Sequence, residues 1–305
     1  MTLEDVIKKN RPRISPNSVK TYVSILSNLF RQVSNTNEIP TSADWFIKNN
    51  ASIMKYLENM PASKRKLRLS ALVVICGDRS DCADIFRTQM IDDIKTYETD
   101  LKNNNQIKTP AQKQNWMSLA QIKQLYNDTK SSILHIIKKQ SVNAKEHAAL
   151  LDFLILSLYY LQPPRRLLDY TEMRLNDETP DPLYNWIDLK NKKFVFVQYK
   201  TAGSYGPQMV DINKDLIELL KKWRRVNPRN EWLLQTYDGR RITPSNLNQR
   251  LHRIFCKKIS VNMLRKIYVS EKVMPNLPKI AELEKAAHDL GNSVETQMLH
   301  YKKSD

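Results

Sequence analysis

Glycine and histidine are scarce in this chain, which has five residues of each among 305. The few glycines exclude an extended glycine-rich loop, and neither a Walker-type phosphate loop nor a dinucleotide fingerprint occurs. The histidines include no pair four residues apart on one helix, the spacing of a common zinc site. We therefore expect chemistry without a metal ion, a nucleotide or another cofactor.

Cysteine and long apolar segments are scarce as well. The three cysteines, Cys76, Cys82 and Cys256, offer neither a disulfide framework nor a zinc-ligand spacing, which fits a reducing compartment. The sequence begins without an apolar signal core, and no apolar run reaches the length of about 18 residues that a membrane span needs. We expect an intracellular protein that does not contact a membrane.

Positive charge, in contrast, is abundant. Lysine and arginine number 49 against 32 aspartates and glutamates, a net charge of +17. Residues 111–305 hold 32 basic and 20 acidic side chains, whereas residues 1–110 hold 17 and 12. Such an excess favours a nucleic-acid partner, because basic side chains neutralise phosphates and release counterions. The alternative is that the charge only keeps the protein soluble.

The first third of the chain predicts short amphipathic helices. Ser15-Pro16 is a typical helix start, and apolar residues then recur every three or four positions up to Val33. Further helices are expected near 43–58, 62–76 and 82–102. The 62–76 segment has a basic run near its start: Lys64, Arg65, Lys66 and Arg68. This run forms either a solvated face or a surface that follows a phosphate backbone.

A polar segment, 103–115, separates this region from the rest and is predicted to be a linker. The predicted domains are therefore 1–102 and 116–305. The second domain is expected to contain helices from 119, at 146–161, 213–226, 245–257, 260–270 and 277–289. Between them, the runs 194–197 and 209–212 flank a turn at 201–206 and predict a small hairpin or a three-stranded sheet. The expected fold class is mainly α with a small β-sheet.

A phosphoryl-transfer site without metal or nucleotide would need cationic side chains and a protein nucleophile. Four places in the second domain offer these groups. They are Arg165-Arg166 before Asp169, Lys200 in the predicted hairpin, Arg265 early in a helix, and Tyr301. Each alone has an ordinary structural explanation as a surface or packing residue.

The order and local context of these residues resemble the tyrosine recombinase (phage integrase) family. The family's Arg-x-x-Glu is similar to Arg166 with Asp169, and its Lys-Thr-Gly hairpin to Lys200-Thr-Ala-Gly203. Its His-x-x-Arg is similar to Asn262-Met-Leu-Arg265, and its Leu-Gly-His-Ser before a tyrosine to Leu290-Gly-Asn-Ser293 before Tyr301. The resemblance is strong over about 150–305 and less specific over 1–105. The segment Pro-Pro-Arg-Arg-x-x-Asp-Tyr, residues 163–170, is most similar to recombinases of large eukaryotic DNA viruses and related mobile elements.

The resemblance implies a two-domain DNA clamp whose second domain is catalytic. Tyr301 would attack a phosphodiester to form a 3′-phosphotyrosyl link, Arg166 and Arg265 would bind the phosphate oxygens, and Lys200 would protonate the leaving 5′-oxygen. No metal or ATP would be needed. The implied partners are double-stranded DNA and further copies of the chain, as a dimer or tetramer on DNA. The implied location is the nucleus or a viral replication site.

Two departures from the family pattern are specific. Asn262 stands where the family pattern has histidine, and Asn292 stands where it has histidine or tryptophan. Asparagine donates hydrogen bonds but cannot shuttle protons near neutral pH. Arg165 competes with Arg166 for the family's arginine position, and the spacing to Asp169 favours Arg166. Arg165, Lys266 and the 64–68 basic run are then expected to contact DNA. Two alternatives stay open: a type IB topoisomerase and a catalytically inactive DNA-binding relative.

Overall fold

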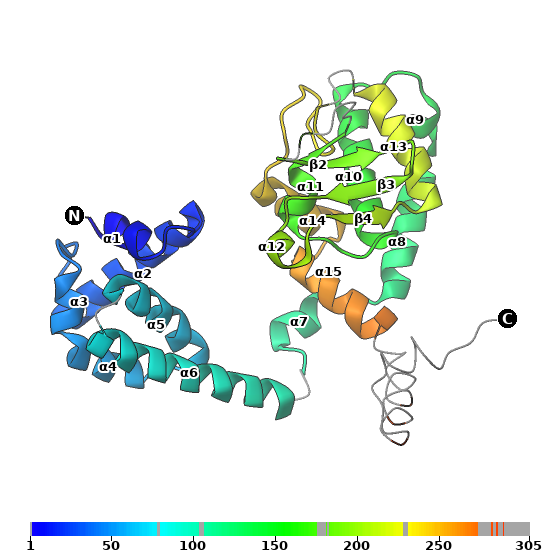
Figure 1. The fold of residues 1–305 in the computed structure, drawn as a ribbon. Coiled ribbons are helices and arrows are strands. Elements are labelled where there is room, and N and C mark those ends of the chain that lie inside the picture. Colours follow the sequence, from blue (N-terminus) through cyan, green and yellow to red (C-terminus); the bar gives the residue numbers. More distant parts are fainter. Residues whose placement is uncertain are drawn as a thin grey trace. The chain divides into compact units, whose positions relative to one another are not determined.

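The computed structural model describes residues 2–273 except 78–79, 104–106, 176–180, 182 and 228–230, and beyond 273 only residues 282, 285 and 289. The chain forms two compact units, Met1–Ile107 and Lys108–Asp305 (Figure 1). Each has its own hydrophobic core. No helix in the described ranges is both long enough and apolar enough to span a membrane.

The described part of the first unit is helical. Its elements are α1 (Leu3–Asn10), α2 (Pro16–Ser34), α3 (Asp44–Lys48), α4 (Asn50–Glu58), α5 (Ala62–Cys76) and α6 (Ser80–Asn103). The predicted start of α2 is confirmed, since the Ser15 side chain accepts a hydrogen bond from the Ser18 backbone N–H. The segment 43–58 forms two helices rather than one, because Asn49 ends α3 in a non-helical conformation before α4 begins.

The helices of the second unit begin inside the predicted linker, where Thr109 caps a short helix. They are α7 (Pro110–Asn115), α8 (Leu119–Ser132), α9 (Leu134–Lys138), α10 (Ala144–Tyr160), α11 (Leu167–Thr171), α12 (Ala202–Tyr205), α13 (Lys214–Val226), α14 (Pro244–Ile254) and α15 (Val261–Tyr268). A π-helical turn, Val269–Val273, follows α15. The predicted helix 277–289 lies outside the described residues apart from 282, 285 and 289.

A small mixed sheet lies among these helices. Its strands, in spatial order, are β1 (Met173–Arg174), β2 (Asn185–Asp188), β3 (Lys193–Phe196) and β4 (Gln208–Asp211). β1 and β2 are parallel, and the other neighbours are antiparallel. The predicted hairpin is β3–β4, with Phe194 opposite Val210, and the predicted turn contains the single-turn helix α12. The coarse fold class, mainly α with a small sheet, is thus confirmed.

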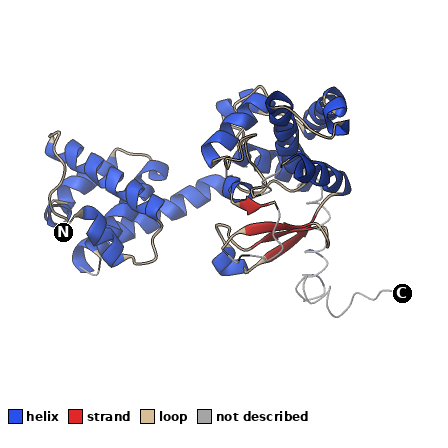
Figure 2. Ribbon diagram, turned by 90° about the horizontal axis from the view of Figure 1, so that it is seen from above, coloured by secondary structure: helices blue, strands red, loops and turns tan. Residues whose placement is uncertain are grey.

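Helices of the second unit gather on one face of this sheet (Figure 2). The central helix α10 is apolar along most of its length and is buried on nearly every side. Trp223 of α13 is completely buried, and its indole N–H donates to the Leu233 carbonyl at 2.8 Å. This core holds the end of α10 and the β3–β4 hairpin in fixed positions, and the candidate site lies where they meet.

Candidate active site

The segment between α10 and α11 carries the two adjacent arginines. Pro163 and Pro164 follow the end of α10, where proline removes a donor and prevents the helix from continuing. Buried Gln162 fastens the segment to the sheet by donating to the Asp211 carbonyl at 3.0 Å. Arg166 is the extended N-cap residue of α11. The two arginines therefore lie on a short fixed connection rather than on a helix face.

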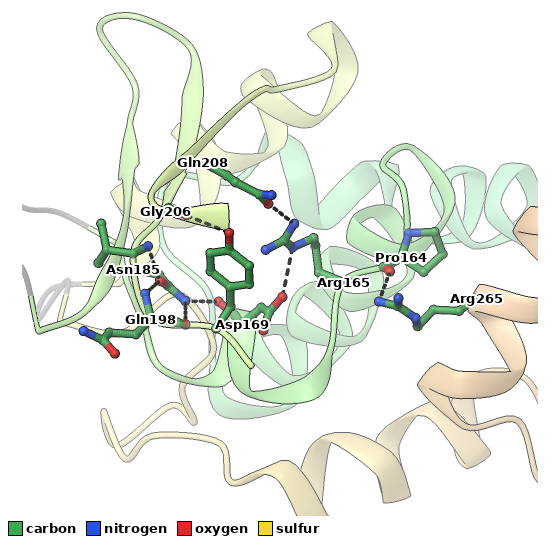
Figure 3. A network of polar contacts seen from close by, with 10 residues as sticks. Pro164, Arg165, Asp169, Asn185, Gln198, Gly206, Gln208 and Arg265 are labelled. Atoms are coloured by element: carbon green, nitrogen blue, oxygen red, sulfur yellow. Dashed lines mark hydrogen bonds and ion pairs between the residues drawn. The ribbon is translucent and has the colours of Figure 1, made fainter. Parts of the chain in front are cut away.

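Protein groups bind two of the three guanidinium nitrogens of Arg165, while its buried Nη2 has no hydrogen-bond partner among the described residues (Figure 3). Its Nε donates to Asp169 Oδ2 at 2.9 Å, and its Nη1 donates to Gln208 Oε1 at 2.8 Å. The guanidinium carbon lies 4.0 Å from the Phe196 ring centroid and 5.1 Å from that of Tyr199. Arg165 thus joins α11 to both strands of the β3–β4 hairpin.

The partners of Arg165 differ from the sequence-based expectation. The spacing associated Asp169 with Arg166 and left Arg165 as a DNA contact, but the Asp169 carboxylate pairs with Arg165, four residues earlier. Asp169 is only 2% exposed, and burial raises its pKa while the charge of Arg165 opposes that rise. An aspartate so deeply buried needs a close cation. The backbone between α10 and α11 directs the Arg165 side chain toward this carboxylate.

Arg265 approaches the same place from α15. Its Nη1 donates to the Pro164 carbonyl at 3.3 Å (Figure 3). Burial and then the charge of Arg166 lower the pKa of the Arg265 guanidinium; Arg165 adds to this effect and Asp169 opposes it. We call Arg165, Arg166, Arg265 and Asp169 the arginine cluster. Three guanidiniums and one carboxylate give it excess positive charge.

Arg166 differs from its neighbour in having its hydrogen-bond donors available. Among the residues that the structure describes, none forms a hydrogen bond or ion pair with the Arg166 guanidinium, which is partly exposed. Its charge lowers the pKa of the Arg265 guanidinium. A guanidinium can donate two parallel hydrogen bonds to a phosphate group, so both arginines have the chemistry of a phosphate site.

Asn185 binds backbone groups of Asp169 and of the residues that follow β3, a role that the sequence analysis did not identify. It is completely buried at the start of β2. Its Nδ2 donates to the carbonyls of Asp169 (3.0 Å) and Gln198 (2.9 Å), and its Oδ1 accepts from the backbone N–H groups of Val197 and Gln198. The amide thereby fastens the end of β3 to α11. A single asparagine has no sequence signal that would reveal this role.

Lys200 follows the part of the hairpin that Asn185 and Arg165 hold. Tyr199, the residue before it, places its ring near Arg165 and donates its hydroxyl to the Gly206 carbonyl at 2.6 Å. Lys200 is the next residue, with its Cα about 3.8 Å from that of Tyr199. Its side chain is exposed.

The remaining predicted residues of α15 lie on its outer side. Val261, Leu264 and Ile267 are buried, so Asn262 and Lys266 are exposed. Asn262 is one helical turn before Arg265 and so lies on the same side of α15. Tyr301 and Asn292 lie outside the described residues.

The four basic residues near the start of α5 differ in their surroundings. Arg65 forms a two-point ion pair with Asp93 of α6, at 2.8 and 2.6 Å, and also contacts the Glu58 carbonyl. Lys66 lies over the Tyr97 ring, and Arg68 donates to the Lys64 carbonyl. Lys64 is exposed. Arg65 therefore holds α5 against α6, whereas Lys64 projects into solvent.

The described residues contain no cluster of three or more histidine, cysteine, aspartate or glutamate side chains suited to a metal ion. No protein-family model, no curated protein and no solved structure matches this chain. Chemically, the arginine cluster can bind a tetrahedral oxyanion through Arg166 and Arg265, while Arg165 and Asn185 hold the surrounding elements together.

Proposed function

We propose that the chain is a DNA strand-transferase of the tyrosine recombinase type, which cuts and rejoins DNA through a 3′-phosphotyrosyl intermediate. The observation that carries the proposal is that Arg265, from a distant part of the sequence, donates to the Pro164 carbonyl two residues before Arg166 and is influenced by the charge of Arg166. Those are the two residues that the family resemblance assigns to the phosphate. The net charge of +17 supports DNA as the partner.

In the proposed reaction the two guanidiniums bind the non-bridging oxygens of the scissile phosphate and stabilise the charge that develops in the transition state. Tyr301 loses its phenolic proton to water, and its oxygen attacks phosphorus while the bond to the 5′-oxygen breaks. Lys200 gives its proton to that 5′-oxygen. The phosphodiester energy is kept in the protein–DNA link, so a second 5′-hydroxyl can reverse the reaction without ATP.

Tyr301 needs a cationic environment, because the ordinary pKa of tyrosine is about 10. The arginine cluster would provide that environment. We also propose that both units bind the same duplex, with Lys64, Lys66 and Lys266 at phosphates, and that a dimer or tetramer assembles on DNA. The asparagines at 262 and 292 would position the phosphate without transferring protons.

A covalent-trapping experiment tests the proposal. Nicked duplexes with a randomised core allow the fragment beside the nick to diffuse away, so that a phosphotyrosyl adduct accumulates and its DNA can be sequenced. We expect an adduct with the intact chain and none with Tyr301→Phe. An adduct that survives Tyr301→Phe would disprove the assigned nucleophile.

The same preparation distinguishes the two alternatives. Relaxation of a supercoiled plasmid without joining of separate duplexes would indicate a type IB topoisomerase. DNA binding with no adduct on any library member would indicate an inactive relative, which the two asparagines at histidine positions would explain.

A further inference from the structure

A pair of cysteine side chains lies in the first unit. Cys76 ends α5 and Cys82 lies in the first turn of α6. Their sulfur atoms are 3.0 Å apart, and both side chains are buried, with 2% and 4% exposed. This contact cannot be predicted from the sequence, because six residues of separation can place two side chains either together or on opposite sides of a helical hairpin.

The helices around the two thiols are firmly positioned. Helices α5 and α6 form a helical hairpin that the Arg65–Asp93 ion pair holds together. Arg65 precedes Cys76 by as many residues as Asp93 follows Cys82, so the ion pair and the two cysteines lie at matching levels of the hairpin. The end of α5 is also held by Asn10, whose Nδ2 donates to the Val74 carbonyl at 2.9 Å. Gly77 then turns the chain with φ of +61°, and a Cβ there would meet Asn10 at 2.7 Å. The contact between the sulfurs therefore follows from the packing of the hairpin.

We propose that Cys76 and Cys82 form an oxidation site, which hydrogen peroxide or a similar small two-electron oxidant converts to an intramolecular disulfide. The required movement is small, because a disulfide has an S–S bond of about 2.05 Å and side-chain rotation alone can supply the remaining ~1 Å. The bond would tie the end of α5 to the beginning of α6. This inference does not depend on the proposed strand-transfer function.

The chemistry balances with peroxide as the only co-reactant. One thiolate attacks peroxide, so that an S–O bond forms as the O–O bond breaks, which gives a sulfenic acid and hydroxide. The second thiol then attacks that sulfur; the S–S bond forms and the sulfenic oxygen leaves as water after taking the remaining proton. In sum, two thiols and one peroxide give one disulfide and two waters.

Arg79 makes the product easy to identify, since it lies between the two cysteines in the sequence. Trypsin cleaves there and separates the peptides 69–79 and 80–87, each with one cysteine. We expect full-length protein treated with peroxide to yield these peptides joined, and a reductant such as dithiothreitol to separate them. A mixture of isotopically heavy and light chains should give joined pairs of one isotope only.

Cys256 provides an internal measure of oxidant exposure, because it is exposed and belongs to the other unit. Oxidation of Cys256 while both peptides keep alkylatable thiols would overturn the proposal. So would joined peptides of mixed isotope, which would show a bond between chains. Neither result depends on a variant that must fold.

A second measurement tests the effect on the hairpin. We expect oxidation to raise the midpoint of thermal unfolding of the first unit, since the closed loop restricts the unfolded chain. The shift should vanish on reduction and be absent in Cys82→Ser. An unchanged midpoint in fully oxidised protein would contradict the claim that the bond ties α5 to α6.

Discussion

Arg165 and Asp169 form an ion pair with a distance of 2.9 Å between Nε and Oδ2, and both side chains are largely shielded from water. The pair separates the two adjacent arginines by role. Arg165 turns inward to the carboxylate, Gln208 and two aromatic rings, whereas the structure describes no such partner for Arg166. Substitution of Arg165 should therefore lower mainly the stability of the second unit, whereas substitution of Arg166 should lower mainly the activity.

Arg165→Ala should reduce the free energy of unfolding of the second unit by about 3 kcal/mol, because it leaves Asp169 buried without its cation. Chemical denaturation, followed by tryptophan fluorescence, measures this change, because four of the five tryptophans, the buried Trp223 among them, belong to the second unit. Arg165→Ala combined with Asp169→Asn should recover part of the loss, since the amide carries no charge. A loss below about 0.5 kcal/mol in the single variant would show that the pair is not structural.

Arg166→Ala should leave the free energy of unfolding within about 0.5 kcal/mol of the parent, which makes it the matched control for Arg165→Ala. The same change should lower the rate of covalent adduct formation about a hundredfold, because one donor to the transition state is lost. Arg166→Lys should restore little of that rate, since an ammonium group cannot form the two parallel hydrogen bonds. Single-turnover trapping on a nicked duplex measures all three proteins. A parent-like rate in Arg166→Ala would remove Arg166 from the proposed phosphate site.

Asn185→Leu should be among the most destabilising single substitutions in the second unit. The buried amide satisfies two carbonyls and two backbone N–H groups, and each such group left unpaired costs about 1–3 kcal/mol. We expect a loss of at least about 3 kcal/mol in the free energy of unfolding. Asn191→Leu is the matched control, because Asn191 is exposed and contacts only Asp188 in the described structure. Equal losses at the two positions would contradict the role of Asn185.

These residues also show how far the sequence could predict the structure. Local signals worked where local physics decides: Ser15-Pro16 predicted the start of α2, and the 194–197 run of aromatic and β-branched residues predicted β3. The motif order indicated Arg166 and Arg265 as partners; in the structure the charge of Arg166 lowers the pKa of Arg265, and their shared role at a phosphate stays a prediction.

The exchange of roles between Arg165 and Arg166 could not be predicted, because it depends on which side of an irregular connection faces a buried carboxylate. Asn185 was equally hidden, since its importance comes from four backbone groups that only the fold brings together. Spacing along the chain predicts periodic elements well. It does not predict the direction of side chains between them.

The buried His147 should make the stability of the second unit depend on pH. It is 2% exposed, its Nε2 donates to Asn227 Oδ1 at 2.8 Å, and burial lowers its pKa from the ordinary value of 6.5. The nearby charge of Arg250 acts in the same direction. The unfolded chain therefore takes up a proton at a higher pH than the folded protein does. Stability should be fully present above about pH 6.5 and decline below it, until the folded protein also binds the proton.

Thermal unfolding between pH 7.5 and 5.5 measures this decline, whose slope for one histidine is at most about 1.4 kcal/mol per pH unit. His147→Gln should be less stable at pH 7.5, yet its stability should fall less steeply with acidification. Identical slopes in the two proteins would show that His147 remains able to accept a proton when folded.

Asn262→His tests what the chain lacks relative to the family that it resembles. Asn262 is exposed and lies one turn before Arg265, so the larger ring should fit with little change in stability. If α15 faces the scissile phosphate as proposed, a histidine there can exchange protons near neutral pH, which asparagine cannot do. We expect adduct formation to accelerate at least about tenfold, with a new dependence on pH centred near 6.5. Asn262→Gln controls for size and should show neither effect. A histidine variant with an unchanged rate and pH profile would place position 262 away from the reacting groups, and would leave Lys200 as the proton donor at the site.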